Sequence, residues 1–295
     1  MHRKAVSAVC ILLCALAGLT AKGKEKEKPP WKDAYVEVGD IKMHYLDSAT
    51  GDRVLVFIPG WMMTVEAWKE QIPYFSSRGF RVIALDPRSQ GLTTKTEAGN
   101  TCQQQAADLH AFLQALKIEH SYLVAAGSGV SVLLDYISSP EALKPEKMVF
   151  VEGSPAVLKV EDFPGIMTIQ QARRLVLGLE DDRAKGTEQY IRSLFKQHPP
   201  EILVNDLIKA SMKMPLSAAL SVFFDYFTGD RRPALLHVPV PSLIVTSPDN
   251  RAVGEYMKGK IPRSSMEVVE SSGPALFLDK SQAFNQVLED FLGEH

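Results

Sequence analysis

The feature that most limits the possible folds of this chain is an alternation of short apolar runs with helical patterns. The run at residues 54–58 has no polar residue, as is typical of a strand buried on both faces of a sheet. Seven further runs predict strands at residues 35–38, 41–46, 81–85, 122–126, 148–151, 243–246 and 266–269. Helical stretches lie between most of them, and this order predicts an α/β fold with a mostly parallel eight-stranded sheet flanked by helices.

One long interval, between the sixth and seventh expected strands, contains no strand pattern. Its spacing predicts four helices, at residues 166–179, 187–197, 200–212 and 216–227. Prolines punctuate them, and proline is accepted in the first turn of a helix but stops the helix before it. We therefore expect a helical cap over residues 154–238, inserted after strand six, which divides the core into residues 34–153 and 239–295.

The first residues have the order of a targeting signal. Arg3 and Lys4 precede an uncharged apolar run at residues 5–19, and small Ala21 offers a cleavage site. This predicts a signal peptide at residues 1–21 and a secreted or periplasmic protein. The alternative is an uncleaved membrane anchor, although the run is shorter than the about 20 residues a span needs. The following segment, KGKEKEKPP, predicts a charged disordered linker over residues 22–33.

Composition excludes several classes of function. The net charge is −2 and the basic residues are scattered, which argues against nucleic-acid binding. Cys10 and Cys14 fall in the signal, so Cys102 is alone in the mature chain and we interpret it as structural. No metal-ligand spacing, phosphate loop or cofactor motif is present, so no metal or cofactor is expected. We expect no stable membrane span in the mature chain, and the sequence identifies no protein partner.

Four local motifs, in order, resemble those of the α/β-hydrolase family. Residues 57–61 (FIPGW) resemble its apolar strand ending in His-Gly-x, and residues 86–93 (DPRSQGLT) resemble its D-x-R-G-x-G-x-S segment. Residues 125–129 (AAGSG) resemble its turn around the nucleophile, and residues 273–280 (GPALFLDK) resemble the Gly-His segment before its last helix. The resemblance spans residues 35–291 and implies acyl-transfer chemistry by a nucleophile, a base and an acid.

The nucleophile of that family stands on a tight turn with the pattern small-x-nucleophile-x-small. Ala125 and Gly129 are the small residues here, which places Gly127 at the nucleophile position without a side chain to attack. A rival register makes Ser128 the nucleophile, but then Val130 would crowd the turn. In the favoured register Ser128 would instead cap the following helix, a role that serine often takes.

The acid and base positions also depart from the family pattern. Pro274 stands where the resemblance implies a histidine, and Asn250 stands where it implies an acid. Asp249, one residue earlier, and Glu152, at the end of the sixth strand, are the fallback acids. No other histidine follows the carboxyl end of a strand, where catalytic groups of such sheets gather. A serine without an adjacent base is a poor nucleophile.

These departures predict a catalytically degenerate protein that keeps a binding pocket. The backbone N–H groups of Trp61 and Ser128 would still point at a carbonyl or carboxylate oxygen. We predict a site for a small apolar ligand at Gly60, Trp61, Met62 and Ser128. The alternatives are an active serine hydrolase of small esters, through Ser128 or another constellation, and a module for protein interaction with a collapsed pocket.

Overall fold

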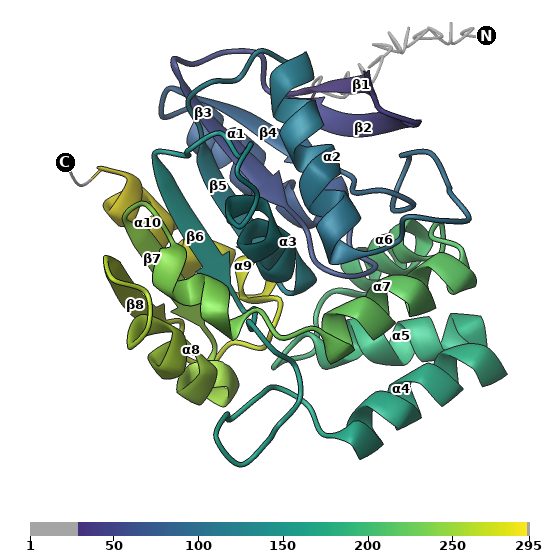
Figure 1. Cartoon of the computed structure of the whole chain (residues 1–295). Helices are drawn as coiled ribbons and strands as arrows, with labels where there is room; N and C mark the ends of the chain where they lie inside the picture. Colours follow the sequence, from purple (N-terminus) through teal and green to yellow (C-terminus); the bar gives the residue numbers. More distant parts are fainter. Residues whose placement is uncertain (1–28, 294–295) are drawn as a thin grey trace, which may run out of the picture.

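The computed structural model describes residues 29–293, which form one sheet flanked by helices (Figure 1). Its eight strands lie in the order β1-β2-β4-β3-β5-β6-β7-β8. Their bounds are β1 Lys32–Val38, β2 Ile41–Asp47, β3 Arg53–Ile58, β4 Phe80–Leu85, β5 Tyr122–Ala126, β6 Lys147–Val151, β7 Ser242–Thr246 and β8 Ser264–Val268. The pairs β1–β2 and β2–β4 are antiparallel and the other five pairs are parallel, which confirms the prediction of a mostly parallel eight-stranded sheet.

The first strand extends further toward the N-terminus than the sequence predicts. Lys32 pairs with Asp47, so the last residues assigned to the charged linker at 22–33 belong to the sheet. Asp33 is held there by His44, whose Nε2 lies 2.5 Å from the carboxylate. The rest of the linker up to residue 28 and the predicted signal peptide at 1–21 lie outside the described residues.

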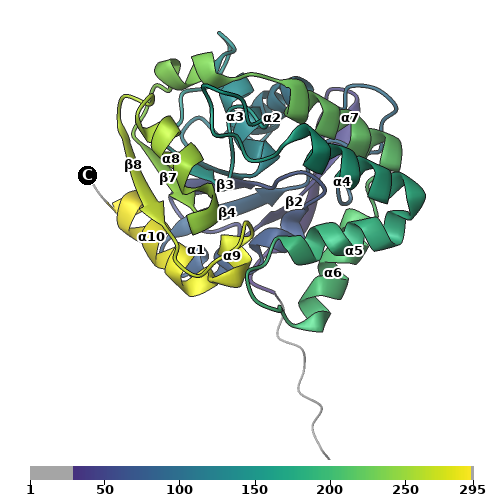
Figure 2. The same cartoon turned by 90° about the horizontal axis from the view of Figure 1, so that it is seen from below.

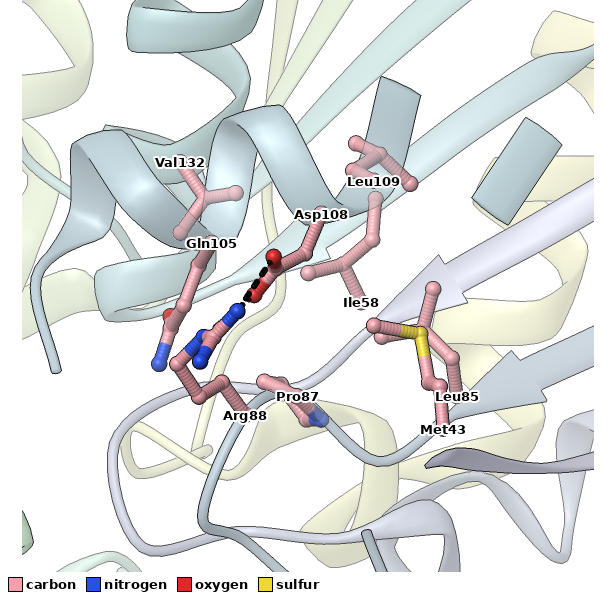
Figure 3. Close-up of a pocket in the computed structure, with 9 residues that line it drawn as sticks. All are labelled: Met43, Ile58, Leu85, Pro87, Arg88, Gln105, Asp108, Leu109 and Val132. Carbon is pink, nitrogen blue, oxygen red and sulfur yellow. Dashed lines mark hydrogen bonds and ion pairs between the residues drawn. The ribbon is translucent and has the colours of Figure 1, made fainter. Parts of the chain in front are cut away.

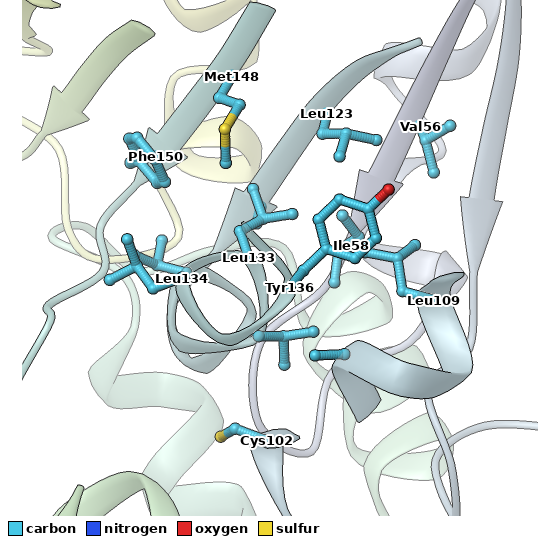
Figure 4. Close-up of a cluster of buried hydrophobic side chains, with 14 of the residues drawn as sticks. Val56, Ile58, Cys102, Leu109, Leu123, Leu133, Leu134, Tyr136, Met148 and Phe150 are labelled. Carbon is cyan, nitrogen blue, oxygen red and sulfur yellow. The ribbon is translucent and has the colours of Figure 1, made fainter. Parts of the chain in front are cut away.

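Alternate residues of the buried strands face two separate hydrophobic layers. On one face, strand residues such as Phe150 pack against α2 and α3, and Figure 4 shows Leu133 and Leu134 of α3 beside Phe150. On the other face, alternate residues of the same strands pack against α1 and α10. The sheet is thus covered on both sides, which explains why its strands read as continuous apolar runs.

The helices divide into those that cover the sheet and those that form the cap. The core contains α1 Gln71–Ser76, α2 Cys102–Ala115, α3 Ser128–Ile137, α8 Arg251–Lys258, α9 Leu276–Asp279 and α10 Ser281–Gly293, with short 3-10 turns at Val65–Trp68, Arg232–His237 and Pro248–Asn250. The cap contains α4 Ile169–Asp181, α5 Arg183–Ser193, α6 Glu201–Ser211 and α7 Leu216–Thr228. These four helices lie together beside one end of the sheet (Figure 2).

The cap has the predicted number of helices, but its first two begin elsewhere than predicted. The first begins at Ile169 rather than residue 166, because the Thr168 side chain caps it in a reciprocal box with Gln171. The second begins at Arg183 rather than residue 187, because Asp182 accepts a hydrogen bond from the Lys185 N–H. Residues 154–168 contain no helix and run irregularly, with three isolated β-bridges.

Cap and core are joined by a half-buried ion-pair cluster. Arg231, after α7, binds Asp135 of α3 at 2.8 Å and Asp225 of α7 at 2.9 Å. Asp225 also accepts the backbone N–H of Cys102. Burial raises the pKa of the Cys102 thiol above its ordinary range, which agrees with a structural role. Across residues 29–293 no single helix is long and apolar enough to cross a membrane, although the bent pair α6 and α7 passes that test together.

Candidate functional site

The turn between β5 and α3 has the backbone of a nucleophile elbow. Gly127 has φ 55° and ψ −124°, a conformation that costs other residues free energy. Its N–H donates to Val151 at 3.0 Å and its carbonyl accepts from Val130 at 3.1 Å. Ser128 follows as the first residue of α3. The structure therefore places Gly127 at the elbow, and Ser128 one position past it.

Small residues are required around this elbow but not at its centre. A Cβ at Gly129 would lie 3.0 Å from the carbonyl oxygens of Ile58 and Pro59, closer than backbone atoms normally allow. A Cβ at Gly127 would meet only the Cα of Gly60, at 3.6 Å, which is ordinary contact. There is thus room for a side chain at the elbow, and the chain has none.

Two backbone N–H groups remain available beside the elbow. Gly60 ends the loop after β3 and lies against Gly127, so the N–H groups of Trp61 and Ser128 come from adjacent loops. Neither N–H has a hydrogen-bond acceptor among the described residues. Paired donors of this kind stabilise a carbonyl or carboxylate oxygen in a site shielded from water.

The D-x-R-like segment after β4 holds the Trp61 loop in place. The Asp86 carboxylate accepts the N–H of Val65 at 2.8 Å and contacts His44 Nδ1 at 2.7 Å. The side chain of Gln90 accepts the N–H of Met62 at 2.7 Å. This motif therefore holds the loop that carries the Trp61 N–H donor.

A cavity of about 400 Å³ lies between the elbow and the cap. This volume is in the range of small-molecule sites. Of the predicted ligand-binding residues, Gly60, Trp61 and Ser128 line it, whereas Met62 does not. The Met62 side chain, at a residue with a φ of 59°, is fully buried and packs with cap residues, and Met63 lines the cavity.

The wall facing the cap is mainly apolar and aromatic. Trp61 donates from its indole Nε1 to the Ala219 carbonyl at 2.7 Å and packs against Tyr190 and Phe223. The Tyr190 hydroxyl donates to the Trp61 carbonyl at 3.2 Å. Tyr190 of α5 and Tyr226 of α7 are lining residues that the sequence reasoning missed, because only tertiary packing decides which face of a cap helix meets the core.

The position of the family's histidine is occupied by Pro274, which lines the cavity. No histidine within residues 29–293 lines it. His44, the most buried of them, belongs to β2, and its ring is fixed there between the carboxylates of Asp33 and Asp86. Ser128 therefore has no imidazole to accept its proton.

The three candidate acid residues lie in very different surroundings. Asp249 is 69% exposed and pairs with Lys196 at 3.2 Å, whereas Asn250 is buried and uncharged. Glu152 is only 8% exposed and its carboxylate accepts the N–H of Ser247. Burial raises the pKa of Glu152 to about 7, a shift that the Ser247 N–H partly opposes. All three residues line the cavity.

A second void lies within the core, beside Arg88 (Figure 3). It holds about 10 Å³, which is at most what one water molecule needs. Arg88 is bound there by Asp108 at 2.8 Å and, from outside, by Asp40 at 2.6 Å. This void has no room for a ligand, and within residues 29–293 no group of three or more metal-binding side chains is found.

Comparison with known proteins places the chain among hydrolase-fold proteins. Residues 55–287 match the model of the alpha/beta hydrolase family. The chain is 24% identical to a non-heme chloroperoxidase of Kitasatospora aureofaciens, over 86% of this chain and 97% of that protein. It is also 24% identical to a karrikin insensitive 2 receptor of Petunia hybrida, over 76% of this chain and 84% of that protein. A solved esterase of Exiguobacterium antarcticum superposes with a TM-score of 0.84 at 21% identity, covering 89% of this chain and all of that one.

Proposed function

This chain belongs to the alpha/beta hydrolase family, and we propose that it binds a small apolar molecule carrying a carbonyl or carboxylate oxygen, without triad catalysis. One observation carries the proposal: the elbow backbone is kept at Gly127 while the side chain is absent. The free N–H groups of Trp61 and Ser128 supply the oxygen site, and the aromatic cap wall supplies apolar contact. The name of the receptor relative is compatible with a binding role.

The proposal is tested by fluorescence titration with aryl and fatty-acid-like esters and carboxylates. The Trp61 ring lines the cavity, so a bound ligand should change its emission. Trp61→Phe should lose the response, and Trp31→Phe should keep it because Trp31 does not line the cavity. If no probe in the panel changes the emission or gives heat in calorimetry, the binding proposal is wrong.

A second candidate function is the hydrolysis of small esters. The relatives named as a chloroperoxidase and an esterase favour this candidate over a purely binding role. It would use Ser128 as nucleophile with Glu152 or Asp249 as the acid, or a constellation other than the family triad. Its specific signature is ester turnover that Ser128→Ala abolishes. The third alternative, an interaction module with a collapsed pocket, is disfavoured by a cavity of about 400 Å³.

Export is a separate proposal, supported only by the order of basic, apolar and small residues before Lys22. Protein recovered outside the cytoplasm should begin near Lys22 when its N-terminus is sequenced. Intact Met1 on protein in a washed membrane fraction would indicate the uncleaved anchor instead. Intact Met1 on cytosolic protein would contradict both.

A further inference from the structure

The wall at the ends of β6 and β7 differs from the rest of the cavity because it is polar. It consists of the Glu152 carboxyl, the Ser247 hydroxyl and the Asn250 amide, which we call the polar wall. We infer that the ligand carries a second polar group, a neutral O–H or N–H donor, that binds Glu152 while its carbonyl oxygen binds near Gly127. This inference rests on the proposed binding function and specifies its ligand class.

The Glu152 side chain is held in place by the backbone around it. The residue has φ 47°, its N–H donates to the Val245 carbonyl at 2.9 Å, and its carboxylate accepts the Ser247 N–H. The Ser247 hydroxyl and the Asn250 amide are further donors beside the carboxyl, and they help to oppose the rise of its pKa. A carboxylate has about four lone-pair positions, so these neighbours still leave one available. The side chain therefore has a fixed direction and spare acceptor capacity.

No cation among the described residues compensates Glu152. No ion pair joins it to a lysine, arginine or histidine within residues 29–293. The Ser247 hydroxyl beside it is buried without a well-directed hydrogen bond. Buried polar groups with unused bonding capacity cost free energy, so a ligand donor placed there gains a bond to a poorly solvated acceptor.

The polar wall and the free N–H pair offer opposite chemistry. The N–H groups of Trp61 and Ser128 donate, whereas the ionised Glu152 carboxylate accepts. A ligand with a carbonyl alone satisfies one end and leaves Glu152 with water. A hydroxylated ester or a similar acceptor and donor pair satisfies both ends, which gives discrimination because the buried carboxylate otherwise keeps an unused acceptor position.

The test uses the three positional isomers of methyl hydroxyphenylacetate and their methyl ethers, titrated by calorimetry. Each ether keeps the carbonyl and the aryl ring but lacks the donor. In the wild type at least one hydroxy isomer should bind about tenfold more tightly than its ether. Glu152→Gln should reduce that ratio to about threefold or less, because an amide can still accept but is uncharged.

Glu270→Gln is the control, since it also removes one carboxylate charge, but from an exposed residue outside the cavity, and it should leave the ratio unchanged. Should Glu152→Gln fail to fold, the wild type itself is compared at about pH 5.5 and about pH 8.5, where the preference should be weak and strong respectively. The cavity is also lined by the titratable groups of Asp249, Lys159, Tyr190 and Tyr226. Asp249 is the one carboxyl among these four, and it is exposed whereas Glu152 is buried.

The outcomes separate the two proposals. If the ethers bind but no hydroxy isomer is preferred, the inference is wrong and the binding function stands. A preference that survives in Glu152→Gln, or that does not depend on pH, also overturns it. If neither esters nor ethers bind, the proposed function fails and the inference fails with it.

Discussion

The elbow after β5 and the loops after β7 and β8 have departed from the family pattern in different ways. At the elbow the backbone conformation is intact and only a side chain is missing, at Gly127. In the two loops, Asn250 and Pro274 stand where the family resemblance implies the acid and the base. The backbone N–H donors of the site are thus present, whereas the catalytic side chains that the resemblance implies are not found at these three positions.

This difference separates binding from catalysis. Backbone N–H donors are part of the fold, so they survive as long as Gly60 and Gly129 allow the two loops to approach. Triad chemistry needs a nucleophile, a base and an acid together, since the three act as a unit. The comparison therefore predicts that the structural glycines matter most for stability and that replacing single triad positions changes little.

The largest expected effect is on the close approach of the elbow. Gly129→Val would force carbons against the carbonyl oxygens of Ile58 and Pro59, which are backbone atoms and cannot move away. We expect the free energy of unfolding to fall by about 3 kcal/mol, measured by urea denaturation. Gly127→Ala is the control and should lose about 1 kcal/mol, because it meets only strain in φ. Equal losses would contradict the distinction.

A smaller effect, dependent on pH, is expected at the buried carboxyl. The pKa of Glu152 is raised from 4.5 to about 7 in the folded protein, so folding favours its protonated form. The stability this contributes is complete below pH 4.5 and is lost as the pH rises to about 7. Glu152→Gln should therefore be more stable than the wild type above pH 7, by about 1 to 3 kcal/mol.

Thermal or urea unfolding across this pH range measures the Glu152 effect, and the two proteins should converge near pH 4.5. Asp249→Asn is the matched comparison, because its exposed carboxylate should change stability by less than about 0.5 kcal/mol at any pH. A wild type that becomes more stable between pH 4.5 and 7, relative to Glu152→Gln, would reverse the sign and refute the assignment.

The smallest effect is expected from restoring one triad position. Gly127→Ser gives a hydroxyl at the elbow but no base, and Pro274→His gives a base with nothing to activate. Either change alone should alter ester turnover by less than about twofold. A gain of activity requires the triple variant, which combines Gly127→Ser, Asn250→Asp and Pro274→His. A large gain from one change would mean that a partner group is already present.

The sheet could be predicted closely because its strands are buried on both faces. The apolar runs located β3 to β7 within one or two residues, for example Arg53–Ile58 against an expected 54–58. Edges were less well predicted: β1 begins at Lys32, where charged residues hide the pattern. Cap helix starts depend on capping by Thr168 and Asp182, which the apolar spacing does not report.

The core side of the site could also be predicted, because it follows the ends of parallel strands. Gly60, Trp61, Gly127 and Ser128 lie together at the cavity, as their motifs indicate. The cap side could not be predicted, since a helical spacing does not say which stripe meets the core. The direction of the Met62 side chain could not be predicted either, because it depends on a left-handed backbone conformation in the loop after β3.

The most direct test of binding without triad catalysis is the turnover of a short activated ester by the wild type and by Ser128→Ala. The account predicts no turnover above background for either protein, under conditions where calorimetry or Trp61 fluorescence shows that an ester binds. Wild-type turnover that disappears in Ser128→Ala would contradict it and establish the hydrolase alternative. Turnover that survives in Ser128→Ala but is lost in Glu152→Gln would contradict it as well.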